Sequence, residues 1–179
     1  MPLATIAADA GVGVGTLYRH FPSREALLAA LTHRSFLVVL SAAIRAADSG
    51  NTPINSLRRF IDETIEHGTE LVLPLHGGPV HLDEDTVAIR NKIHETLGKI
   101  VSQGQQGGSI RPDITAFDII IFGALLAQQL PHIPDWKLVA RREAAIYFDG
   151  LGGTKAESSL PISTNRGPSI RTIPPRPSQ

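Results

Sequence analysis

The sequence predicts an all-α protein of about seven helices, in which a short helix-turn-helix segment precedes a larger helical domain. Three observations favour this fold class. Apolar residues recur every three or four positions through most of the 179 residues, which is the period of an amphipathic helix. Glycine and proline gather at a few places and divide the chain into helix-length segments. No two segments show the alternating pattern of paired strands.

Two short helices joined by a tight turn are predicted at the N-terminus. Ile6 and Ala10 lie four residues apart and so share one helix face. Gly11 follows at the place where a helix end favours a residue with positive φ. The second helix brings a hydroxyl, a phenol, a guanidinium and an imidazole together within five residues, namely Thr16, Tyr18, Arg19 and His20. Such groups suit phosphate oxygens and base edges in a major groove.

Caps and breaks place the later helices. Ser23 is a predicted N-cap, Pro53 suits a first helical turn, and Thr115 with Asp118 forms a predicted capping box. We expect helices over 24–47, 53–72, 84–103, 115–130 and 135–149, separated by breaks rich in glycine, proline, aspartate and asparagine. Residues 152–179 contain five prolines and three glycines, and we expect them to be disordered.

The composition excludes several classes of protein. Seventeen basic and 17 acidic side chains give a net charge of zero, so no global positive field indicates nucleic-acid binding. The chain has no cysteine, which excludes disulfides, zinc–thiolate sites and thiol nucleophiles. Neither a secretory signal nor a run of uncharged apolar residues long enough to span a membrane is evident. We therefore expect a cytoplasmic protein without a membrane partner.

The N-terminal run resembles the DNA-binding domain of the tetracycline-repressor (TetR) family of bacterial transcriptional regulators. The resemblance rests on Ile6-Ala7, Ala10-Gly11-Val12 and the continuous stretch 15–28. It implies three parts: a DNA-binding segment over 1–33, an effector-binding and dimerisation domain over 34–151, and the tail over 152–179. It also implies that double-stranded operator DNA is a partner.

The resemblance assigns roles to single residues of the second helix. Val14, Gly15 and Thr16 would lie at the start of the recognition helix, where family members approach the bases. Tyr18, His20 and Arg24 match positions that hold phosphates, whereas Arg19 is either a backbone contact or a solvated charge.

Family members place a further helix ahead of the position of Leu3, and this chain begins almost directly with the second helix of the domain. We expect Leu3, Ile6, Leu17 and Phe21 to lose part of their cover as a result. The alternative function is therefore a ligand-binding or dimerisation module that has lost DNA binding through truncation of its first helix.

An apolar effector cavity is expected among the longer helices. The resemblance implies a ligand-responsive regulator, most often a repressor, in which an unidentified small molecule changes operator binding. The apolar lining is predicted to include Phe36, Phe60, Ile61, Ile65 and Leu97, and the polar groups to include Glu63, His67, Arg90 and His94. For any single one of these residues, a place in an ordinary core or on a solvated surface is the more common role.

A homodimer is expected from the last two helices, 115–130 and 135–149. The first of them is apolar around more than one face, with Phe117, Ile121 and Leu125 among its apolar residues, so it must be buried on more than one side. Trp136 and Tyr147 on the second helix are residue types enriched at interfaces.

Two other functions are less well supported. The glycine-rich run 11–15 lacks the third glycine and the preceding strand of a dinucleotide-binding loop. His76, His81, Asp83, Glu84 and Asp85 could suggest a metal, but they lack the spacing of known zinc or calcium motifs. No catalytic motif is evident. We expect no enzyme activity, no cofactor and no metal.

Overall fold

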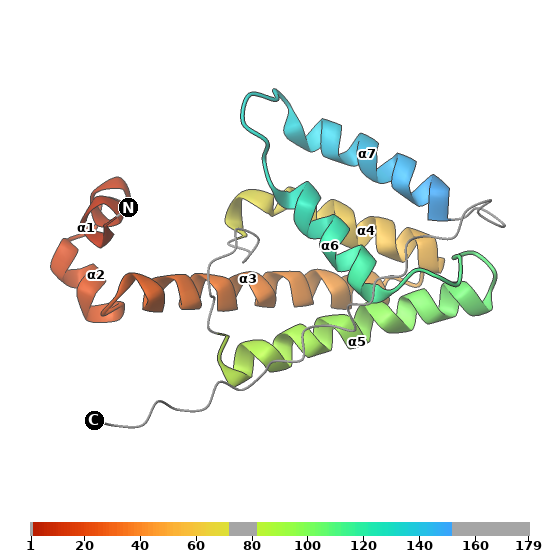
Figure 1. The fold of residues 1–179 in the computed structure, drawn as a ribbon, viewed down its shortest axis with the longest axis horizontal. Coiled ribbons are helices and arrows are strands. Elements are labelled where there is room, and N and C mark those ends of the chain that lie inside the picture. The colour runs from red at the N-terminus through yellow and green to blue at the C-terminus, as the bar shows by residue number, and fades with distance from the viewer. Residues whose placement is uncertain (1, 72–81, 152–179) are drawn as a thin grey trace, which may run out of the picture.

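The computed structural model describes residues 2–71 and 82–151, which form seven α-helices and one 3₁₀ turn (Figure 1). These described residues contain no strand, and the predicted all-α class is confirmed. The elements are α1 (Leu3–Asp9), α2 (Val14–His20), α3 (Arg24–Ala47), α4 (Pro53–Glu66), the 3₁₀ turn η1 (Gly68–Glu70), α5 (Glu84–Gln106), α6 (Ala116–Ala127) and α7 (Trp136–Leu151).

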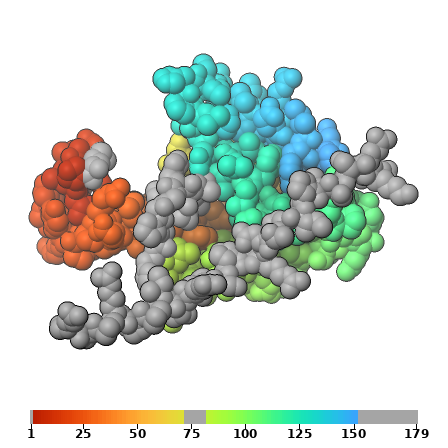
Figure 2. Space-filling view, in the orientation of Figure 1, coloured from red at the N-terminus to blue at the C-terminus, as the bar shows by residue number. Residues whose placement is uncertain are grey.

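Helices α1 and α2 form a small unit beyond the N-terminal end of α3, apart from the other helices (Figures 1 and 2). The turn between them follows a Schellman pattern. Gly11 N–H donates to the carbonyl of Ala8, and Val12 N–H donates to the carbonyl of Ala7, at 3.1 and 3.0 Å. Gly11 has a φ of 66°, as predicted. Leu3 is buried, so the expected loss of cover does not extend to this side chain within the described structure.

Helix α3 joins this small unit to the rest of the molecule. Ser23 caps it by accepting a hydrogen bond from Ala26 N–H at 3.1 Å, which confirms the predicted N-cap. Among the described residues α3 is the one helix long and apolar enough to cross a membrane, a test that core helices of soluble proteins also pass. Here α3 packs against α4 and α5 and contributes Val39, Ala43 and Ala46 to the core.

Helix α4 lies at the centre of the larger domain, where it contacts α3, α5, α6 and α7. Five of its six buried residues follow the spacing i, i+3, i+4, i+7 and i+8, which is one face of a helix; they are Leu57, Phe60, Ile61, Thr64 and Ile65. Gly123 of α6 allows a close approach, because a Cβ at this position would lie 3.0 Å from Cδ1 of Ile61.

Two predicted helices end earlier than expected. Helix α4 ends at Glu66 and not near residue 72, because η1 follows it and Gly68 packs directly on the backbone of Ala127. Helix α6 ends at Ala127 and not at residue 130, since Gln128 takes an extended backbone with a ψ of 119°. The capping box at its start, between Thr115 and Asp118, is present as predicted.

Two other helices run longer than expected. Helix α5 continues past Gly104 to Gln106, because the glycine that ends it is Gly108, with a φ of 69°. Helix α7 continues past Gly150 to Leu151, which is buried and whose carbonyl accepts a hydrogen bond from Arg111 N–H at 3.3 Å. In both cases the glycine at the predicted end, Gly104 or Gly150, lies within the helix.

Candidate DNA-binding surface and ligand cavity

Helix α2 presents its polar side chains to solvent. The predicted DNA-contacting residues are all exposed, namely Val14, Gly15, Thr16, Tyr18, Arg19, His20 and Arg24. Leu17 and Phe21 are only half exposed, and their spacing of four residues gives α2 one apolar edge. The structure therefore leaves all seven predicted residues accessible to solvent on α2 and at the first residue of α3.

This surface is locally basic although the whole chain is neutral. Residues 14–24 contain two arginines and one histidine and no acidic residue. Hydroxyl, imidazole and guanidinium groups are suited to phosphate oxygens, and the next carboxylate along the chain is that of Glu25, which follows Arg24 in the first turn of α3. The arrangement can therefore position α2 against a polyanion.

A second feature is a partly enclosed, mainly apolar cavity of about 50 Å³ between α3, α4, α5 and α6. Its walls are Phe36, Val39, Phe60, Thr64, Arg90, Ile93, His94, Ile120 and Ala124. Four of the predicted effector-binding residues are brought together here, namely Phe36, Phe60, Arg90 and His94. Pockets for drug-sized ligands span about 300–1,000 Å³, so this cavity is smaller than a typical occupied site.

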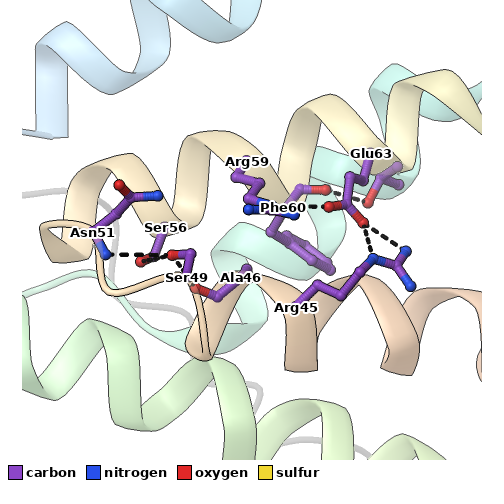
Figure 3. Close-up of polar contacts among 9 residues, drawn as sticks. Arg45, Ala46, Ser49, Asn51, Ser56, Arg59, Phe60 and Glu63 are labelled. Carbon is purple, nitrogen blue, oxygen red and sulfur yellow. Dashed lines mark hydrogen bonds and ion pairs between the residues drawn. The ribbon is translucent and has the colours of Figure 1, made fainter.

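Glu63 and His67 do not line the cavity, which corrects the prediction for these two residues. The Glu63 carboxylate lies between Arg45 and Arg59, with Oε2 2.6 Å from Nη2 of Arg45 and Oε1 3.0 Å from Nε of Arg59 (Figure 3). His67 lies after the end of α4, where Nδ1 is 3.1 Å from Oε1 of Glu70. The rotation of α4 that buries Phe60 turns Glu63 outward. The expected apolar residues Ile61, Ile65 and Leu97 are buried in the core and do not face the cavity.

The prediction missed five cavity residues, which are Val39, Thr64, Ile93, Ile120 and Ala124. A helical signal for some of them exists. Phe60 and Thr64 are four residues apart, as are Arg90 and His94, and Ile120 and Ala124, so each pair shares one helix face. Val39, Thr64 and Ile93 each lie one helical turn after a predicted residue of the same helix.

The polar side of the cavity is formed by Arg90 and His94. His94 stacks on Phe117 with ring centroids 6.2 Å apart. Burial, with a smaller contribution from the nearby charge of Arg90, lowers the pKa of His94 below its ordinary value. Burial thus favours the uncharged form of His94, and Arg90 is the one permanently charged side chain in the wall.

A wider groove of about 310 Å³ lies between the C-terminal end of α3 and α5. It is open to solvent, and its walls include Asp48, Thr96, Lys99 and Gln103. A ligand site is more often enclosed and apolar with a few polar groups. The cavity beside Arg90 fits that description better.

The loop considered for metal binding lies mostly outside the described residues, since His76 and His81 fall there. Asp83 is described, and its carboxylate caps α5 by accepting a hydrogen bond from Thr86 N–H at 2.8 Å. Within the described ranges no three metal-ligating side chains lie together.

The last two helices, α6 and α7, expose large apolar side chains. Leu138 is 69% exposed, Ile146 59% and Leu125 56%. Inside the same pair of helices Phe122 stacks on Tyr147 at 3.9 Å, and Trp136 Nε1–H donates to the carbonyl of Leu126 at 3.0 Å. These inner contacts join α7 to α6, while the outer residues remain uncovered in the single chain.

Comparison with protein families identifies both parts of the chain. Residues 1–31 match the family described as bacterial regulatory proteins of the tetR family. Residues 52–153, more than half of the chain, match the C-terminal domain of SbtR-like transcriptional regulators.

Individual relatives agree with these matches. The HTH-type transcriptional repressor LfrR of Mycolicibacterium smegmatis is 33% identical over 102 residues, which are 56% of this chain and 53% of LfrR. The match thus spans about half the length of that relative. A TetR transcription regulatory protein from Mycobacterium vanbaalenii is 26% identical, with a TM-score of 0.53 over 86% of this chain and 84% of that one. AibR, solved in complex with isovaleryl coenzyme A and operator DNA, shares the fold at 22% identity, with a TM-score of 0.66 over 85% and 87% of the two chains.

Proposed function

Because this chain belongs to the TetR family of bacterial transcriptional regulators, we propose that it is a cytoplasmic repressor that binds operator DNA through α2. A small molecule in the cavity beside Arg90 changes that binding. The family is one of regulators and not of enzymes. The observation on which the proposal chiefly rests is the exposed, locally basic surface of α2 inside the segment that matches the family's DNA-binding domain.

The resemblance assigns the DNA contacts to two groups of side chains. Thr16, with Val14 and Gly15, reads bases, because the N-terminal residues of a recognition helix approach the groove floor. Tyr18, His20 and Arg24 hold phosphates and set the register of the helix. The repressor name of LfrR and the operator complex of AibR support DNA binding as the function, while the roles of the single residues rest on the resemblance.

Helix α3 couples ligand binding in the cavity to DNA binding by α2. This helix begins next to α2, and further along it contributes Phe36 and Val39 to the cavity wall. A ligand larger than the present 50 Å³ must displace part of the wall. Because α3 is continuous, moving the part that contains Phe36 also moves the end attached to α2. Coupling free energies of this kind are typically about 1–3 kcal/mol.

The active form is a homodimer that pairs α6 and α7 of each subunit in a four-helix interface. The exposed Leu125, Leu138 and Ile146 support this arrangement, since a large apolar surface gains free energy when water is removed from it. Two recognition helices at a defined separation then read the two halves of one operator.

Selection of DNA from a random pool, followed by mobility-shift titration at one salt concentration, tests the proposal. We expect a two-fold symmetric site that wild type binds specifically and that Arg24→Ala binds at least about tenfold more weakly, because a charge-assisted phosphate contact is lost. Lys99→Ala removes a charge from α5, far from α2, and should bind like wild type. Recovery of no enriched sequence would contradict the proposal.

A further inference from the structure

Arg90 is the one charged side chain in the wall of an otherwise mostly apolar cavity. The Thr64 hydroxyl in the same wall donates to the carbonyl of Phe60 at 2.8 Å, so its proton is already used. His94 lies one turn after Arg90 on α5, and its ring stacks on Phe117 of α6. The cavity therefore has a mainly apolar wall with a single cationic group, the guanidinium of Arg90.

Arg90 forms no ion pair or hydrogen bond with any other described residue, although it is half buried. Most other arginines of the larger domain reach a carboxylate; these are Arg34, Arg45, Arg58, Arg59, Arg111 and Arg141. A half-buried cation is costly unless an anion or hydrogen-bond acceptor balances it. Among the described residues no acceptor balances the charge of Arg90, and a bound anion would supply one.

We propose that the effector is a monocarboxylic acid with an apolar body, whose carboxylate pairs with Arg90 while its apolar part lies against Phe36, Phe60 and Ile120. This inference rests on the proposed function and names the ligand class of its cavity. A guanidinium presents two parallel N–H donors that match the two oxygens of a carboxylate. One guanidinium and one carboxylate also leave the site neutral.

The site is less suited to a phosphate. A phosphate monoester is close to doubly charged at neutral pH, whereas Arg90 is the one permanently charged side chain in the wall. Burying the second negative charge without a partner would be strongly unfavourable. An amine is excluded by repulsion from Arg90, and an alcohol would leave the guanidinium without a counter-charge.

The small size of the cavity adds a condition. At about 50 Å³ it has room for a few water molecules and not for a chain of several carbons. The carboxylate is therefore expected to bind first at Arg90, while the apolar part opens the space between α3 and α6. This opening is the displacement of α3 on which the proposed coupling depends.

Isothermal titration of the full chain with octanoate and 4-phenylbutyrate tests the ligand class. Each acid is compared with its matched primary alcohol and amine, and octanoate also with octyl phosphate. We expect the acids to bind at least about tenfold more tightly than the alcohols, amines and phosphate. Arg90→Gln should remove the preference for acid over alcohol, Arg90→Lys should keep part of it, and Lys92→Gln, which alters a charge elsewhere on α5, should keep all of it.

Several outcomes would overturn the inference: neither acid binding up to about 1 mM, an alcohol or the phosphate binding as tightly as the matched acid, or Arg90→Gln binding the acids like wild type. Thermal unfolding of each variant separates a lost contact from a lost fold. The operator titration without ligand is independent of all these results, so specific DNA binding can hold while this ligand class fails.

Discussion

Glu63 and Glu66 lie on the solvent side of α4, where each pairs with cations from another helix. Glu63 joins Arg45 of α3, and Glu66 joins Lys137 and Arg141 of α7 at 2.7 and 2.8 Å. Exposed pairs of this kind contribute little each. They connect α3 and α7 to α4 at the surface of a packing that the buried core provides.

The Glu63 pairs predict a pH-dependent stability. Partial burial opposes ionisation of this carboxyl, but the hydrogen bonds and charges of Arg45 and Arg59 outweigh it, so the pKa of Glu63 is lowered from its ordinary value of 4.5. A lowered folded pKa means that the stabilisation is fully present above pH 4.5 and is lost as the pH falls through the folded pKa. We expect Glu63→Gln to reduce the free energy of unfolding by about 1 kcal/mol at pH 7 and by less at pH 3.

Urea unfolding at a series of pH values measures this difference. In an Arg45→Gln background the effect of Glu63→Gln should shrink, because the shared contact is already gone. An effect of Glu63→Gln that stays the same from pH 7 to pH 3 would exclude the ionised pair as its source.

Single residues of α2 should separate affinity from base preference. Thr16→Ala is expected to change the preferred base at one position in each half-site, because its hydroxyl and methyl lie where bases are read. Tyr18→Phe, His20→Ala and Arg24→Ala should weaken binding to all sites alike. Sequencing of DNA selected by each variant distinguishes the two effects. A changed profile for Arg24→Ala with an unchanged one for Thr16→Ala would reverse the assigned roles.

At the level of secondary-structure elements, the end of α4 and the end of α6 approach closely through η1. A Cβ on Gly68 would fall on the backbone carbonyl of Ala127, and backbone cannot move aside as a flexible side chain can. In contrast, a Cβ on Gly98 in α5 would meet nothing within 4 Å. Replacement of glycine by alanine should therefore have opposite effects on stability at Gly68 in η1 and at Gly98 in α5.

We predict that Gly68→Ala lowers the free energy of unfolding by about 1–3 kcal/mol through overpacking. Gly98→Ala should raise it by up to about 1 kcal/mol, since alanine favours the helix. The urea midpoint of each variant checks both signs. A Gly68→Ala protein as stable as wild type would show that η1 can separate from α6 at little cost.

At the scale of the whole molecule, the small unit of α1 and α2 is joined to the larger domain mainly through α3 (Figure 1). The larger domain exposes apolar residues on α6 and α7 at the side away from its own core. A change in the cavity therefore reaches the DNA-binding surface along one helix, and the proposed dimer would relate two such surfaces by symmetry.

Substitution of a charged residue into the proposed interface tests whether the protein forms this dimer. Leu138→Glu and Ile146→Glu should yield folded monomers, because a buried carboxylate without a partner is strongly unfavourable. Leu37→Glu, at a similarly apolar residue that is 44% exposed on α3, should leave the dimer intact. Light scattering gives the mass of each form. A monomeric wild type, or α7 variants that remain dimeric, would contradict the four-helix interface.

The sequence alone determined the features that depend on near neighbours along the chain. The N-cap at Ser23, the capping box at Thr115, the left-handed Gly11 and the helical class all involve residues within about four positions of one another. The family resemblance of the first thirty residues has the same origin, since α1, the turn and α2 form one continuous segment.

Only the tertiary structure decided which face of each helix meets the others. Phe60 and Glu63 are three residues apart, yet one enters the cavity and the other pairs with Arg45 outside it. The close contacts at Gly68 and Gly123 set how α4 and α6 pack, and that packing selects the cavity wall. Local pattern encodes that α4 is amphipathic, but the angle at which four helices meet depends on the volumes of side chains far apart in the sequence.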